Sequence, residues 1–290
     1  MLPHTRDFPT PPPVAGLPTK TDPGSAGIRH LETLEEFQSC VDLQIAVWGA
    51  EFTDVVPASI LQVASHIGGL ILGAFADDTL IGFVFGLSGV RRDEIVHWSH
   101  MLGVRADARE MGIGRRLKEA QRAELARRGI AREFWTFDPL QARNAHLNVN
   151  RLGVRVIDYA VNMYGTTGSP LHLGIATDRF IVELDTTKAP RPTPVMMKAT
   201  PVQTALPIYT PSPRVGDIIA DEDQPASALI EIPWDVQNGN GLSADEMLSW
   251  RMATRSYFQW AFLHGYRVTA LHRDREAQRA FYVVDRHGDV

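Results

Sequence analysis

The stretch Val104–Ala120, VRADAREMGIGRRLKEA, combines small residues with positive charge at the expected start of a helix. Gly112 and Gly114 let a ligand approach the backbone without a side chain in the way, and Arg109 stands three residues before the first of them. Further positive charge around the same point comes from Arg115, Arg116 and Lys118. The first turn of a helix carries unpaired backbone N–H groups and a partial positive charge. The pattern therefore predicts a site for a phosphate or pyrophosphate group.

Two common phosphate-binding loops do not fit this stretch. A dinucleotide-binding fingerprint needs a third glycine and a parallel βαβ unit, whereas position 117 is Leu and the preceding strands are expected to be antiparallel. A Walker loop is also absent from the sequence. On the glycines alone, an ordinary strand-to-helix turn with solvated arginines is an equally good interpretation.

The residues around the glycines resemble the acetyl-CoA-binding motif of the GNAT acetyltransferase superfamily. In that motif a strand ending Leu-x-Val is followed by a proline and then by Arg-x-x-Gly-x-Gly at the start of a helix. The matching residues are Leu102, Val104, Arg109, Gly112 and Gly114, while Ala106 stands where proline is usual. The expected element order from about residue 28 to 185 is also similar to that of the superfamily. The resemblance implies an α+β fold with a mixed, mostly antiparallel sheet flanked by helices.

The resemblance also implies a reaction, the transfer of an acyl group, expected to be acetyl, from acetyl-CoA to an amine without a metal ion. Backbone N–H groups of residues 111–115 would hold the pyrophosphate of coenzyme A. The strand edge at residues 102–104 would pair with the pantetheine arm and polarise the thioester carbonyl. The implied cofactor-binding residues are Leu102, Gly103, Val104, Arg109, Glu110, Met111, Gly112, Ile113, Gly114, Arg115 and Asn144. For Asn144, which opens the next helix, a purely local capping role is the alternative.

Histidine 100 is the candidate base, because the attacked amine must be neutral. Strand alternation predicts one face with Trp98, His100 and Leu102 and another with His97, Ser99 and Met101. In arylalkylamine-type acetyltransferases a histidine at the place that matches His100 takes part in deprotonating the amine, and histidine titrates near neutral pH. A packed, hydrogen-bonded strand histidine is the alternative. His97 and His100 would face opposite sides, and no carboxylate pattern completes a metal site.

The general acid is less well marked. The superfamily often has a tyrosine four residues before the glycine that ends the helix after the fifth strand, and counting back from Gly153 gives Val149. Tyr159, Tyr164 or solvent are the substitutes.

Two residues are candidates for binding the acceptor. Asp138, at the end of the strand FWTFD, could bind a substrate ammonium, or it could only terminate the turn with Pro139. Trp98 is one of several aromatic residues expected on the acceptor side, together with Trp135, Phe137 and Tyr159.

The elements that must position these residues follow from hydrophobic periodicity. Strands are expected at residues 27–32, 70–76, 79–89, 94–104, 131–139, 154–165, 178–185, 228–235, 266–274 and 279–285. Helices are expected at residues 34–48, 57–69, 112–129, 142–153 and 243–264. In the first helix, Leu34, Phe37, Val41 and Ile45 fall at helical spacing, and in the last, Ser243 and Glu246 form a capping box.

Proline content divides the chain of 290 residues into four parts. Residues 1–26 are expected to form a flexible arm, residues 27–185 an acetyl-CoA-binding domain, residues 186–216 a linker, and residues 217–290 an accessory α+β region. The accessory region is expected to dock on the first domain or on another subunit.

Composition limits the partners and the setting. The net charge of −5 argues against nucleic acid or an anionic membrane as partner, and no apolar run is long enough to cross a bilayer. A single cysteine excludes an internal disulfide and suits a cytoplasmic protein; a homodimer is compatible with the sequence. We expect a small-molecule amine as acceptor. The alternatives are a protein or peptide acceptor and a non-catalytic CoA-binding or sensory module.

Overall fold

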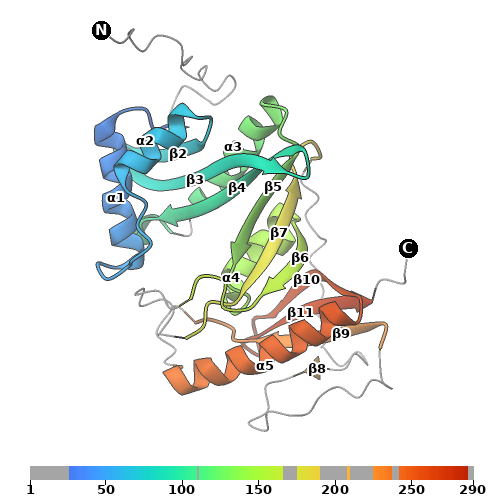
Figure 1. Cartoon of the computed structure of the whole chain (residues 1–290). Coiled ribbons are helices and arrows are strands. Elements are labelled where there is room, and N and C mark those ends of the chain that lie inside the picture. Colours follow the sequence, from blue (N-terminus) through green and yellow to red (C-terminus); the bar gives the residue numbers. More distant parts are fainter. Residues whose placement is uncertain are drawn as a thin grey trace, which may run out of the picture. The chain divides into compact units, whose positions relative to one another are not determined.

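The computed structural model describes residues 26–109, 111–165, 175–189, 208–209, 225–236 and 242–286 (Figure 1). The predicted arm, except for Ala26, and most of the predicted linker lie outside these residues. The chain divides into two compact units. Unit 1 runs to Phe134 and includes Asp185–Thr187, and unit 2 contains Trp135–Leu184 and the chain from Lys188 onward.

Unit 1 is a sheet with helices on both faces. Its strands are β1 (Gly27–His30), β2 (Leu70–Ala76), β3 (Thr79–Arg91), β4 (Glu94–Val104) and the first half of β5 (Arg132–Phe137). Its helices are α1 (Leu34–Trp48), α2 (Ala58–His66), a 3₁₀ turn η1 (Ala106–Ala108) and α3 (Ile113–Arg127). Strands β1 to β4 are antiparallel neighbours, and β5 is parallel to β4. The predicted order of elements in this part of the chain is confirmed.

The hairpin between β2 and β3 turns at the predicted place. Asp77 and Asp78 both have positive φ, 45° and 62°, as a two-residue turn that matches the twist of the strands requires. One apolar cluster packs α3 against one face of the sheet, and a second packs α1 and α2 against the other, as can be followed in Figure 1.

The face that α1 buries differs from the prediction. Leu34 and Ile45 are 56% and 41% exposed, whereas Phe37, Cys40, Leu43 and Gln44 are buried. Apolar spacing alone did not reveal this face because one of its members is polar. The Gln44 amide exchanges hydrogen bonds with the backbone of Val56, which satisfies it in the interior.

Strand β4 contains a β-bulge that the alternation rule did not anticipate. Phe85 of β3 pairs with Met101, but the next residue, Gly86, pairs with Ser99, so His100 is the extra residue. Before the bulge, Ser99 faces α3; after it, Met101 packs in the cluster with α1 and α2. The predicted faces are therefore wrong beyond the bulge, because one extra residue reverses the alternation.

Unit 2 joins the second half of the predicted acetyl-CoA-binding domain to the C-terminal region. Its elements are the end of β5, α4 (Ala142–Ala145), the π-helix η2 (His146–Leu152), β6 (Arg155–Ala160), β7 (Arg179–Asp185), β8 (Ile208–Tyr209), β9 (Ser227–Ile232), α5 (Ala244–Leu263), β10 (Tyr266–Asp274) and β11 (Arg279–Arg286). Strands β5, β7 and β6 are neighbours in that order, and the second sheet has the order β10-β11-β9-β8. The two-residue strand β8 lies at an edge of that sheet, parallel to β9, as a proline-rich segment allows.

A single apolar core in unit 2 contains residues from both halves. Phe180 of β7 packs edge-on against Phe258 of α5, with ring centroids 4.7 Å apart, and against Tyr282 of β11 at 5.3 Å. The predicted capping box of α5 is confirmed, since the Ser243 and Glu246 side chains each accept from the other's backbone N–H. In the part of the chain that the structure describes, no helix has both the length and the apolar character needed to cross a bilayer.

Candidate functional site

The N-terminus of α3 is open and lies next to glycine. Gly112 is the N-cap residue with φ 74° and ψ 9°, and an added Cβ would meet no atom within 4 Å. Without a side chain, Gly112 cannot accept hydrogen bonds from the N–H groups of the first turn. Gly114, one residue into the helix, faces β4, where a Cβ would lie 3.4 Å from Leu102. The predicted loop therefore presents bare backbone donors beside the end of β4.

The other two long helices, α1 and α5, have a different kind of N-terminus. Both α1 and α5 begin with a capping box and carry two acidic residues in the first turn. Helix α3 has no acidic residue in its first turn and carries Arg115 and Arg116 instead. Its N-terminus is thus the one of the three suited to an external anion.

Positive charge at this end comes from fewer residues than the sequence predicted. Arg109 Nε lies 3.4 Å from the Val104 carbonyl oxygen, and the partly exposed Arg115 pairs with Glu119 at 2.7 Å. Lys118 does not contribute, because its ammonium is buried and forms an ion pair with Glu133 on β5. Glu110, a predicted cofactor residue, lies outside the described residues.

One edge of β4 is free of strand partners over the predicted thioester-binding residues. Along its other edge β4 pairs with β3 up to Val104, while β5 pairs with it only at His97 and Trp98. Among the described strands, none pairs with the β5-side edge of β4 from Ser99 to Val104. Backbone groups on this edge are available to an extended ligand.

Within the bulge, the imidazole of His100 is exposed to solvent on one side. Its ring packs edge-on against Phe85, with centroids 6.1 Å apart. Partial burial lowers the pKa of His100, and the negative charge of Asp54 opposes that shift. His100 is therefore neutral near pH 7 and able to accept a proton.

The neighbouring His97 has a structural role. It is fully buried, and its Nε2 and Nδ1 atoms lie 3.2 Å from Gln121 Nε2 and 3.1 Å from Ser88 Oγ. Because an amide N–H only donates, Nε2 accepts and Nδ1 carries the proton. Burial, helped by the charge of Lys118, lowers the pKa of His97 to about 3. The same Gln121 side chain accepts from Ser99 Oγ at 2.9 Å and from Lys118 Nζ at 2.8 Å, which fixes the strand just before the bulge.

The sequence of this part of the chain matches a known protein family. Residues 32–153 match the model of the acetyltransferase (GNAT) family. Residues 32–153 are a GNAT acetyltransferase segment. Enzymes of this family transfer an acyl group from acetyl-CoA to an acceptor, and the match extends over residues 32–153. A search of curated proteins found no match.

Solved acetyltransferase structures resemble a little over half of the chain. The ribosomal-protein-S18-alanine N-acetyltransferase of Escherichia coli is 20% identical, with a TM-score of 0.45, over 57% of this chain and 96% of that one. An N-acetyltransferase from Staphylococcus aureus Mu50 is 15% identical, with a TM-score of 0.46, over 56% and 99%. A putative acetyltransferase from Salmonella typhimurium, solved with its cofactor acetyl-CoA, is 14% identical, with a TM-score of 0.46, over 58% and 98%.

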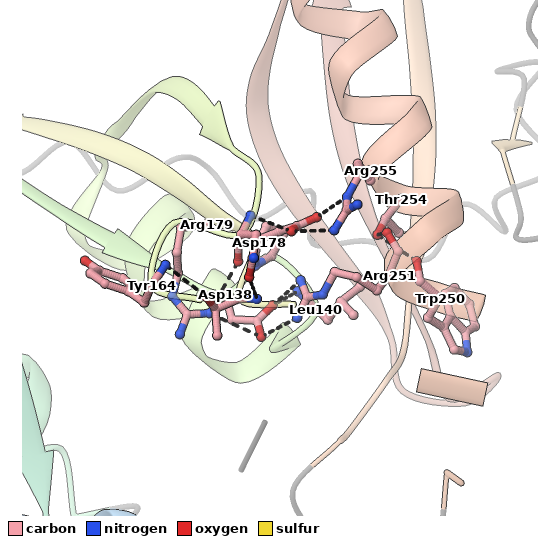
Figure 2. A network of polar contacts seen from close by, with 12 residues as sticks. Asp138, Leu140, Tyr164, Asp178, Arg179, Trp250, Arg251, Thr254 and Arg255 are labelled. Atoms are coloured by element: carbon pink, nitrogen blue, oxygen red, sulfur yellow. Dashed lines mark hydrogen bonds and ion pairs between the residues drawn. The ribbon is translucent and has the colours of Figure 1, made fainter. Parts of the chain in front are cut away.

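In the GNAT segment, the predicted ammonium ligand Asp138 is already engaged. Its carboxylate accepts two hydrogen bonds from Arg251 of α5, at 2.9 and 2.7 Å, and lies 3.5 Å from Arg179 (Figure 2). Burial would raise the pKa of Asp138, but the charge of Arg251 outweighs it and the pKa is lowered. Both Asp138 and Arg251 are almost fully buried, so this carboxylate serves to join β5 to α5 rather than to receive a ligand.

A second carboxylate holds the candidate acid Tyr159. The Tyr159 hydroxyl donates to Asp178 Oδ2 at 2.7 Å, and Arg255 of α5 binds both oxygens of Asp178 at 2.8 Å. Burial and the hydrogen bond to the Asp178 carboxylate raise the pKa of Tyr159, which opposes proton release. Figure 2 shows Arg251 and Arg255 reaching from α5 to the two carboxylates. Sequence reasoning gave no sign of these arginines.

The other predicted residues of unit 2 have local partners. The Tyr164 hydroxyl lies 3.1 Å from Thr136 Oγ1, and Arg179 stacks over its ring at 5.5 Å. Asn144 Oδ1 accepts from Asn148 at 2.8 Å, and Val149 is buried in the core. Of the aromatic residues predicted on the acceptor side, Trp135, Phe137 and Tyr159 are core residues of unit 2, whereas Trp98 in unit 1 is half-buried.

Proposed function

We propose that this GNAT protein transfers an acetyl group from acetyl-CoA to the amine of a small molecule in a ternary complex. The observation that carries the proposal is the pairing of two features in unit 1. The open N-terminus of α3 offers backbone N–H groups to a pyrophosphate, and beside it the unpartnered edge of β4 offers backbone groups to the pantetheine arm and thioester.

The reaction needs one base. In the proposed step His100 takes a proton from the acceptor ammonium, and the neutral nitrogen attacks the thioester carbon. The new C–N bond forms and the C–S bond breaks, and a second proton from nitrogen ends on the thiolate sulfur. The carbonyl oxygen gains negative charge on the way, which the β4 backbone N–H groups stabilise. Because Tyr159 is bound to Asp178, Tyr164 or solvent is the proposed relay that gives a proton to sulfur and takes the second proton from nitrogen in its place.

Cofactor contacts beyond the loop belong to this proposal as well. Leu102, Gly103 and Val104 supply the edge of β4, residues 111–115 the pyrophosphate donors, and Arg109 an exposed positive charge. Asn144 is retained as a candidate contact to the pantetheine arm, in competition with its bond to Asn148. Trp98, half-buried on β4, is retained as a candidate acceptor contact.

The test is thiol release from acetyl-CoA in the presence of a panel of small amines and a panel of short peptides. Release with small primary amines, at rates above those with peptide N-termini or lysines, supports the proposal. Faster turnover of peptides would assign the protein to the protein acetyltransferases. Tight acetyl-CoA binding without turnover of either panel would indicate a CoA-binding module.

A further inference from the structure

Gln121 of α3 holds two residues of β4 on the face of the sheet that α3 covers. Its side chain is completely buried. Its Nε2 donates to His97 Nε2 at 3.2 Å, and its Oε1 accepts from Ser99 Oγ at 2.9 Å. His97 and Ser99 are the last two residues of β4 that face α3 before the bulge at His100. One buried amide thus fixes the orientation of the strand up to the bulge.

Beyond the bulge, apolar contacts hold the strand. Leu102 packs against the apolar cluster that includes α3, and Met101 packs in the cluster with α1 and α2. Because side chains alternate along a strand, Ser99 and Leu102 can both face α3 only if one extra residue lies between them. That residue is His100, whose ring leaves the α3 face and packs on Phe85, with centroids 6.1 Å apart.

The ends of β4 would allow a second position for the bulge. With Trp98 as the extra residue, only the partners of Gly86 and Leu87 on β3 would change. His100 would then face α3, and Ser99 would face the opposite side of the sheet. Neither His100 nor Ser99 is apolar, so the burial of apolar side chains does not favour one position over the other. The polar contacts of these residues therefore decide between the two positions.

We infer that Gln121 is a positioning residue, which keeps the bulge of β4 at His100 and so holds the imidazole on the solvent-exposed side of the strand. The hydrogen bond from Ser99 to Gln121 forms only in this position, because in the other Ser99 faces away from α3. In the other position α3 would cover the imidazole, which could not reach an acceptor.

Gln121 also connects the two parts of the proposed site. It lies on the helix that begins after Gly112, so one helix carries the proposed pyrophosphate donors and positions the proposed base. The inference rests on the proposed transferase function, because it concerns the direction of the base in that reaction.

The test replaces Gln121 by methionine, a side chain of similar length that cannot form these hydrogen bonds. In Gln121→Met the Ser99 hydroxyl has no partner in the interior, whereas solvent can bind it when Ser99 faces away from α3. Adding Ser99→Ala gives residue 99 an apolar side chain, which favours the interior again. The matched control adds Ser88→Ala instead, which removes a hydroxyl 3.1 Å from His97 and leaves Ser99 unchanged.

Three measurements separate the position of the bulge from a general loss of structure. A nuclear Overhauser contact between the rings of His100 and Phe85 reports the position of the bulge in substrate-free protein. The rise in Tm caused by acetyl-CoA reports the N-terminus of α3. Thiol release from acetyl-CoA with the fastest amine of the panel gives kcat and the KM for acetyl-CoA.

We expect Gln121→Met to lose the contact between His100 and Phe85 and about 100-fold in kcat, the cost of a misplaced catalytic group, but to keep its Tm rise and its KM for acetyl-CoA. Gln121→Met/Ser99→Ala should regain the contact and most of the kcat. Gln121→Met/Ser88→Ala should behave like Gln121→Met. A Gln121→Met protein that keeps the contact, or a double variant with Ser99→Ala that does not regain it, would overturn the inference.

Two further outcomes are also decisive. If Gln121→Met does not fold, the inference requires that adding Ser99→Ala restores a folded protein with the ring contact and that adding Ser88→Ala does not; any other result overturns it. If the wild-type protein releases no thiol with any amine, the proposed reaction is refuted, while the ring contact still tests the role of Gln121.

Discussion

Substitutions of two glycines at opposite ends of α3 distinguish the effect of backbone strain from the effect on ligand binding. Gly112 at the N-terminus and Gly129 after the C-terminus have φ values of 74° and 73°, and neither position has an atom within 4 Å of an added Cβ. We expect Gly112→Leu and Gly129→Leu each to lower the free energy of unfolding by about 1–2 kcal/mol, the cost of a left-handed conformation for a residue with a side chain. Only Gly112→Leu should abolish the rise in Tm caused by acetyl-CoA, because only there does the side chain block the pyrophosphate. Equal ligand-induced shifts in both variants would remove the loop from the site.

His100→Gln tests the base. Because partial burial lowers the pKa of His100 below its usual value of about 6.5, the wild-type imidazole is neutral at pH 7, and kcat should fall only as the pH drops through this lowered pKa. We expect the variant to lose about 100-fold or more in kcat, to keep its KM for acetyl-CoA, and to lose the acidic limb of the profile. A variant with an unchanged pH–rate profile would exclude His100 from the reaction.

At the residue scale, the sequence predicts those parts of the site that a local pattern encodes. The Gly-x-Gly helix entrance and the candidate His100 follow from residues that are neighbours in the chain. The role of Asp138 could not be predicted, because the arginine that neutralises it, Arg251, is 113 positions away. Lys118 was predicted beside the phosphate, yet its helical position turns it to Glu133 in the interior.

Among the elements, boundaries were easier to predict than faces. Capping residues and the Asp77–Asp78 turn are local signals, and the structure confirms them. The buried face of α1 and the bulge of β4 depend on tertiary contacts. Gln44 can be buried because its side-chain amide forms hydrogen bonds with the Val56 backbone. The bulge of β4 lies next to Ser99, whose hydroxyl donates a hydrogen bond to Gln121 of α3.

The buried pair between α3 and β5 should be costly to break on one side only. Lys118 and Glu133 are 4% and 0% exposed, and burial shifts the pKa of each toward its neutral form. Lys118→Met, which strands the Glu133 carboxylate, should lower the free energy of unfolding by about 3–5 kcal/mol, and adding Glu133→Leu should recover part of that loss.

Urea denaturation measures both values, and Arg115→Met is the control. The Arg115–Glu119 pair on the same helix is about half exposed, so its loss should cost less than about 1 kcal/mol. A double variant less stable than Lys118→Met would contradict the idea that the stranded carboxylate causes the damage.

For the whole molecule, the C-terminal region is part of the fold of unit 2. Truncation after Thr187 would remove three aromatic partners of Phe180, namely Phe258, Phe262 and Tyr282. It would also leave Asp138 without Arg251 and Asp178 without Arg255. Loss of the arginine that pairs with a buried carboxylate and exposure of an apolar core are each severely destabilising. We expect the truncated chain to aggregate, as size-exclusion chromatography and near-UV circular dichroism would reveal. A monomeric fragment that unfolds cooperatively would show that α5 and its sheet are dispensable.

The division of the chain into units also sets an order of events on the ribosome. Unit 1 is complete once Thr186 has emerged and bonded to Ile130 and Ala131, whereas the core of unit 2 needs β11, which ends at Arg286. Roughly 100 residues separate these points, and at about 5–20 residues per second their synthesis takes about 5–20 seconds. During that interval β6 and β7 are made but have no α5 to cover them. At this stage unit 1 of the nascent chain can be folded, whereas the apolar residues of unit 2 are still exposed. We therefore expect chaperones that recognise apolar segments to bind the nascent chain during this interval.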